Sequence, residues 1–334
     1  MLALRSEILL TRSGIILART SRTAIPARLA PLPPRARNSS CRAFRTMRPV
    51  VAAAGKESEE AYTMADQAAR FAEQKRTNNK RALDIEDGVY DPSSLKGKRV
   101  LVTGANRGVG LALCTELKDI GAVVIGVCRK SSPELAALQV AQIVEGIDVM
   151  NTACMQKMVD EIIPTGALDV VVNNAGYFYE PEEKIDSLNF EEELKMIDIC
   201  ALGPLRITAA LVNAGLVASG GKVAMITSQG GSIAWRDVQN PDGGDYGHHM
   251  SKAASNMAGK LLSKELKKKG ITVTMLHPGF NKTEMTAKYA EIWEVEGAVD
   301  GSVGAKRVVH EIGQMSLEKT GLFINCEDGL LIPW

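Results

Sequence analysis

No cysteines or histidines stand at the spacing of metal ligands in this sequence of 334 residues. There are six cysteines and four histidines, but no CxxC pair and no cysteine at ligand spacing from a histidine. The cysteines are Cys41, Cys114, Cys128, Cys154, Cys200 and Cys326. Because most of them lie in apolar stretches, we expect small buried side chains there and no metal site.

Long apolar runs are absent as well. Near the N-terminus, the runs Ile8–Leu10 and Ile15–Ala18 are separated by the polar stretch Thr11–Ser13. A membrane-spanning helix needs about 20 mostly apolar residues. These runs are too short for a secretory core or a membrane span, and the sequence predicts neither.

Lysine and acidic residues are nearly missing from residues 1–50. This segment holds ten arginines, no lysine and one acid, Glu7. Such an Arg-rich, Ser/Thr-bearing composition is typical of an organelle transit peptide, although a disordered basic tail has the same composition. We predict a disordered transit peptide over residues 1–52. The small-residue run Val50–Gly55 favours a plastid (chloroplast) over a mitochondrion.

The remaining residues are acidic, with 30 basic and 38 acidic side chains and a net charge of −8. Nucleic-acid-binding domains need a basic surface, so this balance argues against nucleic acid as a partner. With hydrophobic residues at 45%, the chain is long enough to bury the core of one large domain.

The chain divides into a polar extension and an α/β domain. Residues 53–95 are rich in charge, and we predict a surface extension with a helix over Glu57–Gln74. From Lys96 onward, short β-branched runs alternate with longer amphipathic segments. The runs are Arg99–Thr103, Ala122–Val127, Ile143–Val149, Leu168–Asn173, Lys222–Thr227, Ile271–Leu276 and Leu322–Asn325. Continuous apolar strands between helices predict a parallel sheet covered on both faces, and hence a single doubly wound Rossmann-like domain over residues 96–334.

A glycine-rich turn, TGANRGVG at Thr103–Gly110, follows the first predicted strand. Gly104, Gly108 and Gly110 let the backbone turn tightly and approach a pyrophosphate, which the free N–H groups of the following helix can bind. A simple tight turn would need the same glycines. The position between a strand and a helix, at the start of a doubly wound pattern, favours a nucleotide site.

The second predicted strand lacks a terminal acid. It ends GVCRK, with Arg129 and Lys130 where an acid would hydrogen-bond the ribose 2′-hydroxyl of NAD. Arg107 in the glycine turn adds a third cation. Ordinary solvated surface cations would show the same pattern, but a 2′-phosphate suits them well, and we predict NADP(H).

Three motifs resemble those of the short-chain dehydrogenase/reductase family. They are the spacing GxxxGxG of the glycine turn, NNAG at Asn173–Gly176, and Pro278–Gly279 after the sixth predicted strand. The resemblance spans about Lys96–Trp334, and the ending DGLLIPW is most similar to the C-factor-like branch. It implies that NNAG supports the adenosine side, that Asp148 at the end of the third strand meets the adenine amino group, and that Thr283 reaches the carboxamide or phosphates. The predicted cofactor-binding residues are Gly104, Asn106, Arg107, Gly108, Val109, Gly110, Arg129, Asp148, Asn174, Ala175, Gly176, Lys252, Pro278, Gly279 and Thr283.

The resemblance also implies a catalytic serine, tyrosine, lysine and asparagine. Ser228 matches the serine and Lys252 the lysine, but the tyrosine position, four residues before Lys252, holds His248. The asparagine position holds Cys200. Tyr246, six residues before Lys252, points away from it on a helix, and we interpret it as a pocket or packing residue.

The altered position changes the expected chemistry. Beside Lys252 the imidazolium form of His248 is disfavoured, so we expect a neutral ring near pH 7. A neutral imidazole is a competent general base and a poor acid. The site is therefore biased toward alcohol oxidation, or toward reduction with water as the final proton donor.

Two functions stay open on the sequence. The first is an NADP(H)-dependent oxidoreductase acting on a small carbonyl or alcohol substrate. The second is a catalytically inactive NADPH-binding sensor or assembly protein in an organelle. The substrate-facing segments Gln229–Gly244 and Phe280–Gly301 are both present, which favours the enzyme. We interpret His249 as a partly exposed helix residue, His277 as a strand-end residue and His310 as a surface helix residue.

The predicted helix Met250–Lys269 carries apolar residues at helical spacing. In the resembled family this helix often forms a dimer interface, which implies a homodimer or homotetramer. A stripe that packs on the sheet would have the same pattern.

Overall fold

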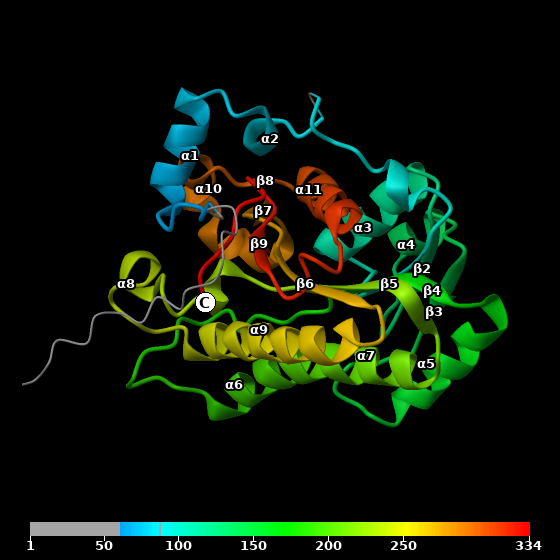
Figure 1. The fold of residues 1–334 in the computed structure, drawn as a ribbon. Helices are drawn as coiled ribbons and strands as arrows, with labels where there is room; N and C mark the ends of the chain where they lie inside the picture. Colours follow the sequence, from blue (N-terminus) through cyan, green and yellow to red (C-terminus); the bar gives the residue numbers. More distant parts are fainter. Residues whose placement is uncertain (1–60, 87) are drawn as a thin grey trace, which may run out of the picture. The chain divides into compact units, whose positions relative to one another are not determined.

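The computed structural model describes residues 61–86 and 88–334 (Figure 1). The transit peptide predicted over residues 1–52, Cys41 and the start of the predicted helix Glu57–Gln74 lie outside the described residues.

Seven parallel strands form one sheet in the described part of the chain. They are β1 (Arg99–Thr103), β2 (Val123–Val127), β3 (Gln142–Val144), β4 (Leu168–Asn173), β5 (Val217–Ile226), β6 (Thr272–His277) and β9 (Phe323–Asn325). Their order is β3-β2-β1-β4-β5-β6-β9, and every neighbouring pair is parallel. The predicted doubly wound α/β fold is confirmed. The strand order reverses between β1 and β4, and ligands of such sheets bind in the crevice beyond the carboxyl ends at this point.

Helices cover both faces of the sheet (Figure 1). The longer ones are α1 (Gln67–Arg76), α3 (Gly108–Asp119), α5 (Cys154–Ile162), α6 (Phe190–Ile197), α7 (Gly203–Asn213), α9 (Tyr246–Lys267) and α11 (Gly301–Gln314). The shorter helices are α2 (Lys80–Leu83), α4 (Pro133–Ala137), α8 (Arg236–Gln239) and α10 (Trp293–Glu296). Single helical turns are η1 (Ser93–Leu95), η2 (Ile163–Thr165), η3 (Asp198–Leu202) and η4 (Gln229–Gly231), and η5 (Glu284–Ile292) is longer. Two short strands outside the main sheet, β7 (Asn281–Lys282) and β8 (Val299–Asp300), pair with each other.

The strands are apolar throughout because each face contacts its own core. In β1, Leu101 belongs to the core that contains Leu262 of α9. Its neighbour Val100 belongs to the opposite core, with Leu113 of α3 and Val308 of α11. Adjacent residues of a strand point to opposite faces, so a strand buried on both faces shows no alternation in its sequence.

The third strand is shorter than predicted. The prediction ran over Ile143–Val149, but β3 ends at Val144 because Gly146 turns the chain with φ +75° and donates its N–H to the carbonyl of Arg129, 3.0 Å away. Asp148 therefore lies beyond the strand and not at its end.

The predicted surface extension is wrong for residues 61–95, which pack on the domain. Helix α1 begins at Gln67 because Asp66 caps it, accepting a hydrogen bond of 2.8 Å from Ala69 N. One face of α1 is buried at Gln67, Arg70 and Gln74, and Tyr62 forms a β-bridge with Leu331.

His310 is buried and not a surface residue. It lies on α11 under α2 and the segment that follows it: Arg81 Nη1 of α2 is 3.2 Å from its Nε2, and Asp91 N is 3.3 Å from its Nδ1. The extension thus covers the outer face of α11. The prediction of buried cysteines is confirmed for Cys114, Cys128, Cys200 and Cys326, whereas Cys154 is partly exposed. Among the described residues, no group of His, Cys, Asp or Glu is suited to a metal.

The stretch Phe190–Asn213, which joins α6, η3 and α7, is apolar and long enough to cross a membrane by length and composition. Ile207 and Leu211 of this stretch belong to the core under the sheet. Its other face exposes Phe190 and Leu194. We interpret it as a core helix with one exposed apolar face.

Candidate active site

The glycine turn after β1 fits a pyrophosphate. Gly104 has φ +66°, and a Cβ on Gly110 would lie 2.1 Å from the carbonyl oxygen of Gly104. At Gly108 nothing lies within 4 Å of the Cβ position, and no side chain caps the N-terminus of α3 at Arg107. The first N–H groups of α3 are thus left for a ligand beside open space, as phosphate binding requires.

Hydrogen bonds join the Asn173–Gly176 turn to the glycine turn. Asn174 Nδ2 donates to the carbonyl oxygen of Thr103 at 3.0 Å, and the Thr103 hydroxyl accepts from the backbone N–H groups of Asn174 and Ala175, each at 3.0 Å. A Cβ on Gly104 would lie 2.9 Å from Ala175 Cα. The two turns therefore form one rigid unit across the switch point.

The three predicted cations are exposed. Arg129 and Lys130 lie immediately beyond β2, and Arg107 forms an exposed ion pair of 3.0 Å with Glu284 at the start of η5. Cations at the end of β2 lie where the fold places the adenosine ribose.

Ser228 begins the turn that follows β5. Its Oγ accepts a hydrogen bond of 3.0 Å from Gly230 N, which leaves the hydroxyl proton for a ligand. A Cβ on Gly230 would lie 2.9 Å from Nε2 of His248. The serine turn and the histidine are therefore in direct contact.

His248 lies in the first turn of α9. Its ring meets Phe178 edge-on at 4.9 Å between centroids, and its buried Nδ1 has no hydrogen-bond partner among the described residues. Burial lowers the pKa of His248 well below 6.5, and Lys252 lowers it further. The predicted neutral ring is confirmed, with burial as the larger cause.

Lys252 follows His248 by one helical turn. Its Nζ lies 4.0 Å from the Cβ position of Gly176. The lysine thus reaches from α9 to the end of the Asn173–Gly176 turn. Lys252, His248 and the Ser228 turn come from α9 and β5 to one end of the sheet, as predicted.

Cys200 lies in the π-helical turn η3 and is buried. Such turns are frequent at functional sites because they displace one residue from the helix. The Sγ donates to the carbonyl oxygen of Tyr177 at 3.5 Å. Its single proton is therefore used within the protein, and the thiol is a weak donor in any case.

Two aromatic side chains that the sequence did not predict, Phe178 and Tyr289, lie on one side of His248. The rings of Phe178 and Tyr289 are 6.3 Å apart, and Lys288 Nζ lies 4.1 Å from the Phe178 ring centroid. Burial raises the pKa of Tyr289 to about 12. Phe178 lies two residues after the Asn173–Gly176 turn, and this closeness in sequence could have indicated it. Tyr289 lies far along the chain, and no sequence pattern indicated it.

The partly exposed position expected for His249 on α9 is confirmed. The residue also links two elements: its Nδ1 is 2.9 Å from the carbonyl oxygen of Gly230, and Arg236 and Asn240 contact the ring. Tyr246 was expected to be a pocket or packing residue; it is 38% exposed, which argues against packing and leaves the pocket role as a prediction.

The remaining predicted cofactor residues lie in turns around the same edge. Asp148 accepts a hydrogen bond of 3.0 Å from Met150 N, and Gly279, with φ +85°, packs on Glu327. Thr283 caps η5. Asn106, Val109 and Pro278 are partly buried.

Comparison with known proteins gives a family match. The model described as short chain dehydrogenase matches residues 98–292. The 1-hydroxy-2-glutathionyl-2-methyl-3-butene dehydrogenase of Rhodococcus sp. (strain AD45) is 30% identical over 236 residues, 70% of this chain and 99% of that protein. C-signal of Myxococcus xanthus is 34% identical over 170 residues, 51% of this chain and 95% of that protein.

Solved structures agree with the fold. The carbonyl reductase Sniffer of D. melanogaster superposes with a TM-score of 0.61 at 27% identity, over 72% of this chain and 100% of that one. A short chain dehydrogenase from Burkholderia cenocepacia J2315 in complex with NADP has a TM-score of 0.59 at 25% identity, over 71% of this chain and 98% of that one.

Proposed function

Because the chain belongs to the short-chain dehydrogenase/reductase family, we propose that it is an NADP(H)-dependent oxidoreductase acting on a small carbonyl or alcohol. The observation that carries the proposal is the contact of His248 with the Ser228 turn, on the helix that presents Lys252. The carbonyl reductase fold of one solved relative supports the substrate class.

The residues present fit NADP(H). The glycine turn and the uncapped N-terminus of α3 would hold the pyrophosphate. Arg129 and Lys130, with no acid between them and β2, would hold the 2′-phosphate. Lys252 would contact the nicotinamide ribose beside Gly176. The bound cofactor would supply or accept the hydride; one solved relative is in complex with NADP.

Ser228 and His248 have the two remaining roles, which are polarisation of the substrate oxygen and proton transfer. The Ser228 hydroxyl, which already accepts from Gly230 N, donates its proton to the substrate oxygen and polarises it. The neutral His248 accepts the proton that an alcohol loses on oxidation. In the reverse direction the histidine is a poor acid, and water must supply the proton.

The test is the pH dependence of both directions with a panel of alcohols and carbonyls. Oxidation with NADP⁺ should be independent of His248 ionisation from pH 6.5 to 9, because the ring is neutral throughout. Reduction with NADPH should fall as the pH rises, because the proton passes from water through His248 and the protonated form of the ring becomes scarcer. A reduction rate as fast at pH 9 as at pH 6.5 would contradict the assigned role of His248.

A second candidate is a catalytically inactive NADPH-binding sensor or assembly protein. It is favoured by Cys200, whose thiol is bound to the Tyr177 carbonyl where the resembled family has a relay asparagine. Tight NADPH binding without turnover of any carbonyl or alcohol would support it.

A homodimer or homotetramer is proposed from the surface of α9. Met250, Met257 and Leu261 are exposed there, and α6, which packs beside α9, exposes Phe190 and Leu194. Apolar patches of this kind commonly mark protein interfaces. A monomer mass by light scattering at micromolar concentration would remove this proposal.

A plastid location, with the mitochondrion as the alternative, rests on the composition of residues 1–52. Import of a fluorescent protein fused behind residues 1–60 into isolated chloroplasts, and not into mitochondria, is the expected result.

A further inference from the structure

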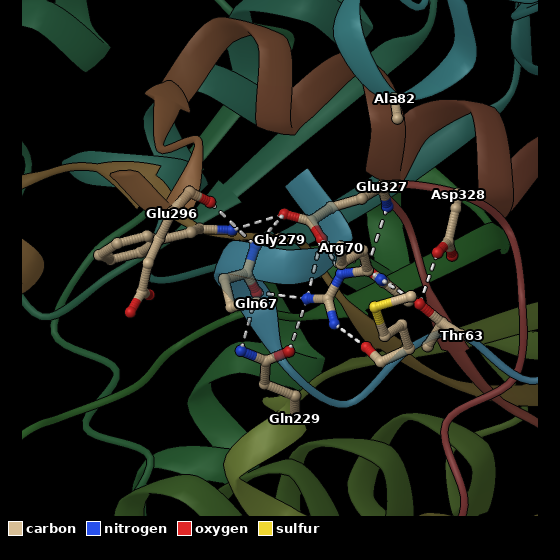
Figure 2. Close-up of polar contacts among 12 residues, drawn as sticks. Thr63, Gln67, Arg70, Ala82, Gln229, Gly279, Glu296, Glu327 and Asp328 are labelled. Carbon is tan, nitrogen blue, oxygen red and sulfur yellow. Dashed lines mark hydrogen bonds and ion pairs between the residues drawn. The ribbon is translucent and has the colours of Figure 1, made fainter. Parts of the chain in front are cut away.

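Helix α1 carries a buried ion pair at the end of the sheet where the candidate site lies (Figure 2). Arg70 and Glu327 have side chains that are 3% and 4% exposed, and Arg70 Nη2 lies 3.1 Å from Glu327 Oε2. Arg70 Nη2 also donates to Gln229 Oε1 at 2.9 Å. The family match begins at residue 98, so α1 and its contacts lie outside the matched part of the chain.

Glu327 connects this pair to the turn after β6. A Cβ on Gly279 would lie 2.7 Å from Glu327 Cγ, and Phe280 N donates to Glu327 Oε1 at 3.3 Å. Figure 2 shows the Glu327 carboxylate between Gly279 and the Arg70 guanidinium. The beginning of the segment Phe280–Gly297 is therefore held from α1 through Glu327. This segment is here called the substrate loop.

The other end of the substrate loop is held directly by α1. Gln67 Nε2 donates to the carbonyl oxygen of Glu296 at 3.1 Å. A Cβ on Gly297 would lie 2.4 Å from the Phe71 ring, so the ring packs on the glycine backbone. Between these anchors, η5 has no buried residue. A segment without a core of its own depends on its end contacts for its position.

The serine turn is tied to the same helix. Gln229, next to Ser228, accepts from Arg70 and donates from its Nε2 to Gln67 Oε1 at 3.0 Å. Two sides of the candidate site, the serine turn and the substrate loop, thus share anchors on α1. Charge-assisted and buried hydrogen bonds of this kind are stronger than exposed ones.

We propose that α1 is part of the active-site enclosure, with Arg70 and Gln67 as positioning residues that fix the substrate loop against the serine turn. The proposal rests on the proposed function for the loop's role in substrate binding, but the positioning itself is independent of catalysis. Loss of the anchors should release the loop and weaken substrate binding more than hydride transfer.

The test compares Arg70→Met with Arg76→Met in the full chain. Arg76 lies on the exposed face of the same helix and pairs only with Glu73 among the described residues, so its variant controls for loss of charge on α1. Hydrogen–deuterium exchange of residues 280–297 should become at least tenfold faster in Arg70→Met, with β1 and β4 unchanged. Exchange in Arg76→Met should match the unchanged protein.

A milder variant, Gln67→Met, keeps the Arg70–Glu327 ion pair and removes the hydrogen bonds of Gln67 to Glu296 and Gln229. Faster exchange of residues 293–297 and of the serine turn is expected there, with residues 280–284 less affected, so the proposal stays testable if Arg70→Met does not fold. With an active enzyme, KM for the carbonyl should rise about tenfold in Arg70→Met while kcat changes less than threefold. Loop exchange that stays unchanged, or that accelerates by the same factor as the strands, would overturn the proposal. Loop release in a protein without turnover would uphold it while removing the proposed function.

Discussion

Acidification should weaken the fold through one histidine in particular. His277, the last residue of β6, is 5% exposed, and neither ring nitrogen has a hydrogen-bond partner among the described residues. Burial lowers the pKa of His277 from 6.5 to about 4, although the nearby Glu327 partly opposes the shift. His277 is therefore protonated near pH 6.5 in the unfolded chain, whereas in the folded chain it is protonated only near pH 4. The contribution of His277 to stability is constant above pH 7 and falls as the pH drops through this window, by about 2 kcal/mol at pH 5.

The assay is urea unfolding at pH 7.5 and pH 5.0 for the unchanged protein and for His277→Leu. Leucine cannot titrate and leaves no buried polar atom. The unchanged protein should lose about 2 kcal/mol more free energy of unfolding between the two pH values than the variant does. His248, His249 and His310, whose pKa values are also lowered mainly by burial, act in the same direction in both proteins and cancel. Equal losses in the two proteins would refute the reasoning.

Three further changes and one control test the site and its surroundings. Arg129→Glu should raise the Kd for NADPH at least tenfold and leave that for NADH unchanged in a fluorescence titration, because the 2′-phosphate loses a cation; equal effects on both would count against the assigned pocket. Gly110→Ala, whose Cβ would lie 2.1 Å from the Gly104 carbonyl oxygen, should lower stability by about 1–3 kcal/mol and abolish NADPH binding. Gly301→Ala, with its nearest contact at 3.8 Å, should do neither. Asn256→Leu should raise the free energy of unfolding by about 1 kcal/mol, because neither polar atom of its buried side chain has a partner among the described residues; a loss of stability would show that the amide is satisfied in solution.

The strands and the nucleotide turn could be predicted because their signals are local. Arg99–Thr103 and Leu168–Asn173 were placed to the residue, since a strand buried on both faces shows as an unbroken apolar run. Asp148 was placed at the end of the third strand because the turn at Gly146, within the run Ile143–Val149, could not be recognised in the sequence. The positive φ of Gly146 is seen only in the structure.

The errors at α1 and at His310 have one cause. The charged composition of residues 61–95 resembles a solvated surface, but Arg70 meets Glu327 and Arg81 meets His310 across more than 220 residues of chain. A charged side chain can be predicted to be buried only when its distant partner is known, and no local sequence pattern identifies that partner. The same holds for Tyr289, which reaches the Phe178 ring beside His248 from a distant loop.

We propose that His248 takes the place of the tyrosine in an active enzyme. The decisive measurement is NADPH-dependent turnover of a carbonyl panel by residues 51–334, side by side with the His248→Tyr variant. Measurable, NADPH-dependent turnover by the unchanged protein is expected, with a pH profile that differs from that of the variant. A silent unchanged protein beside an active variant would contradict the proposal, and would show an intact pocket whose proton carrier has been lost.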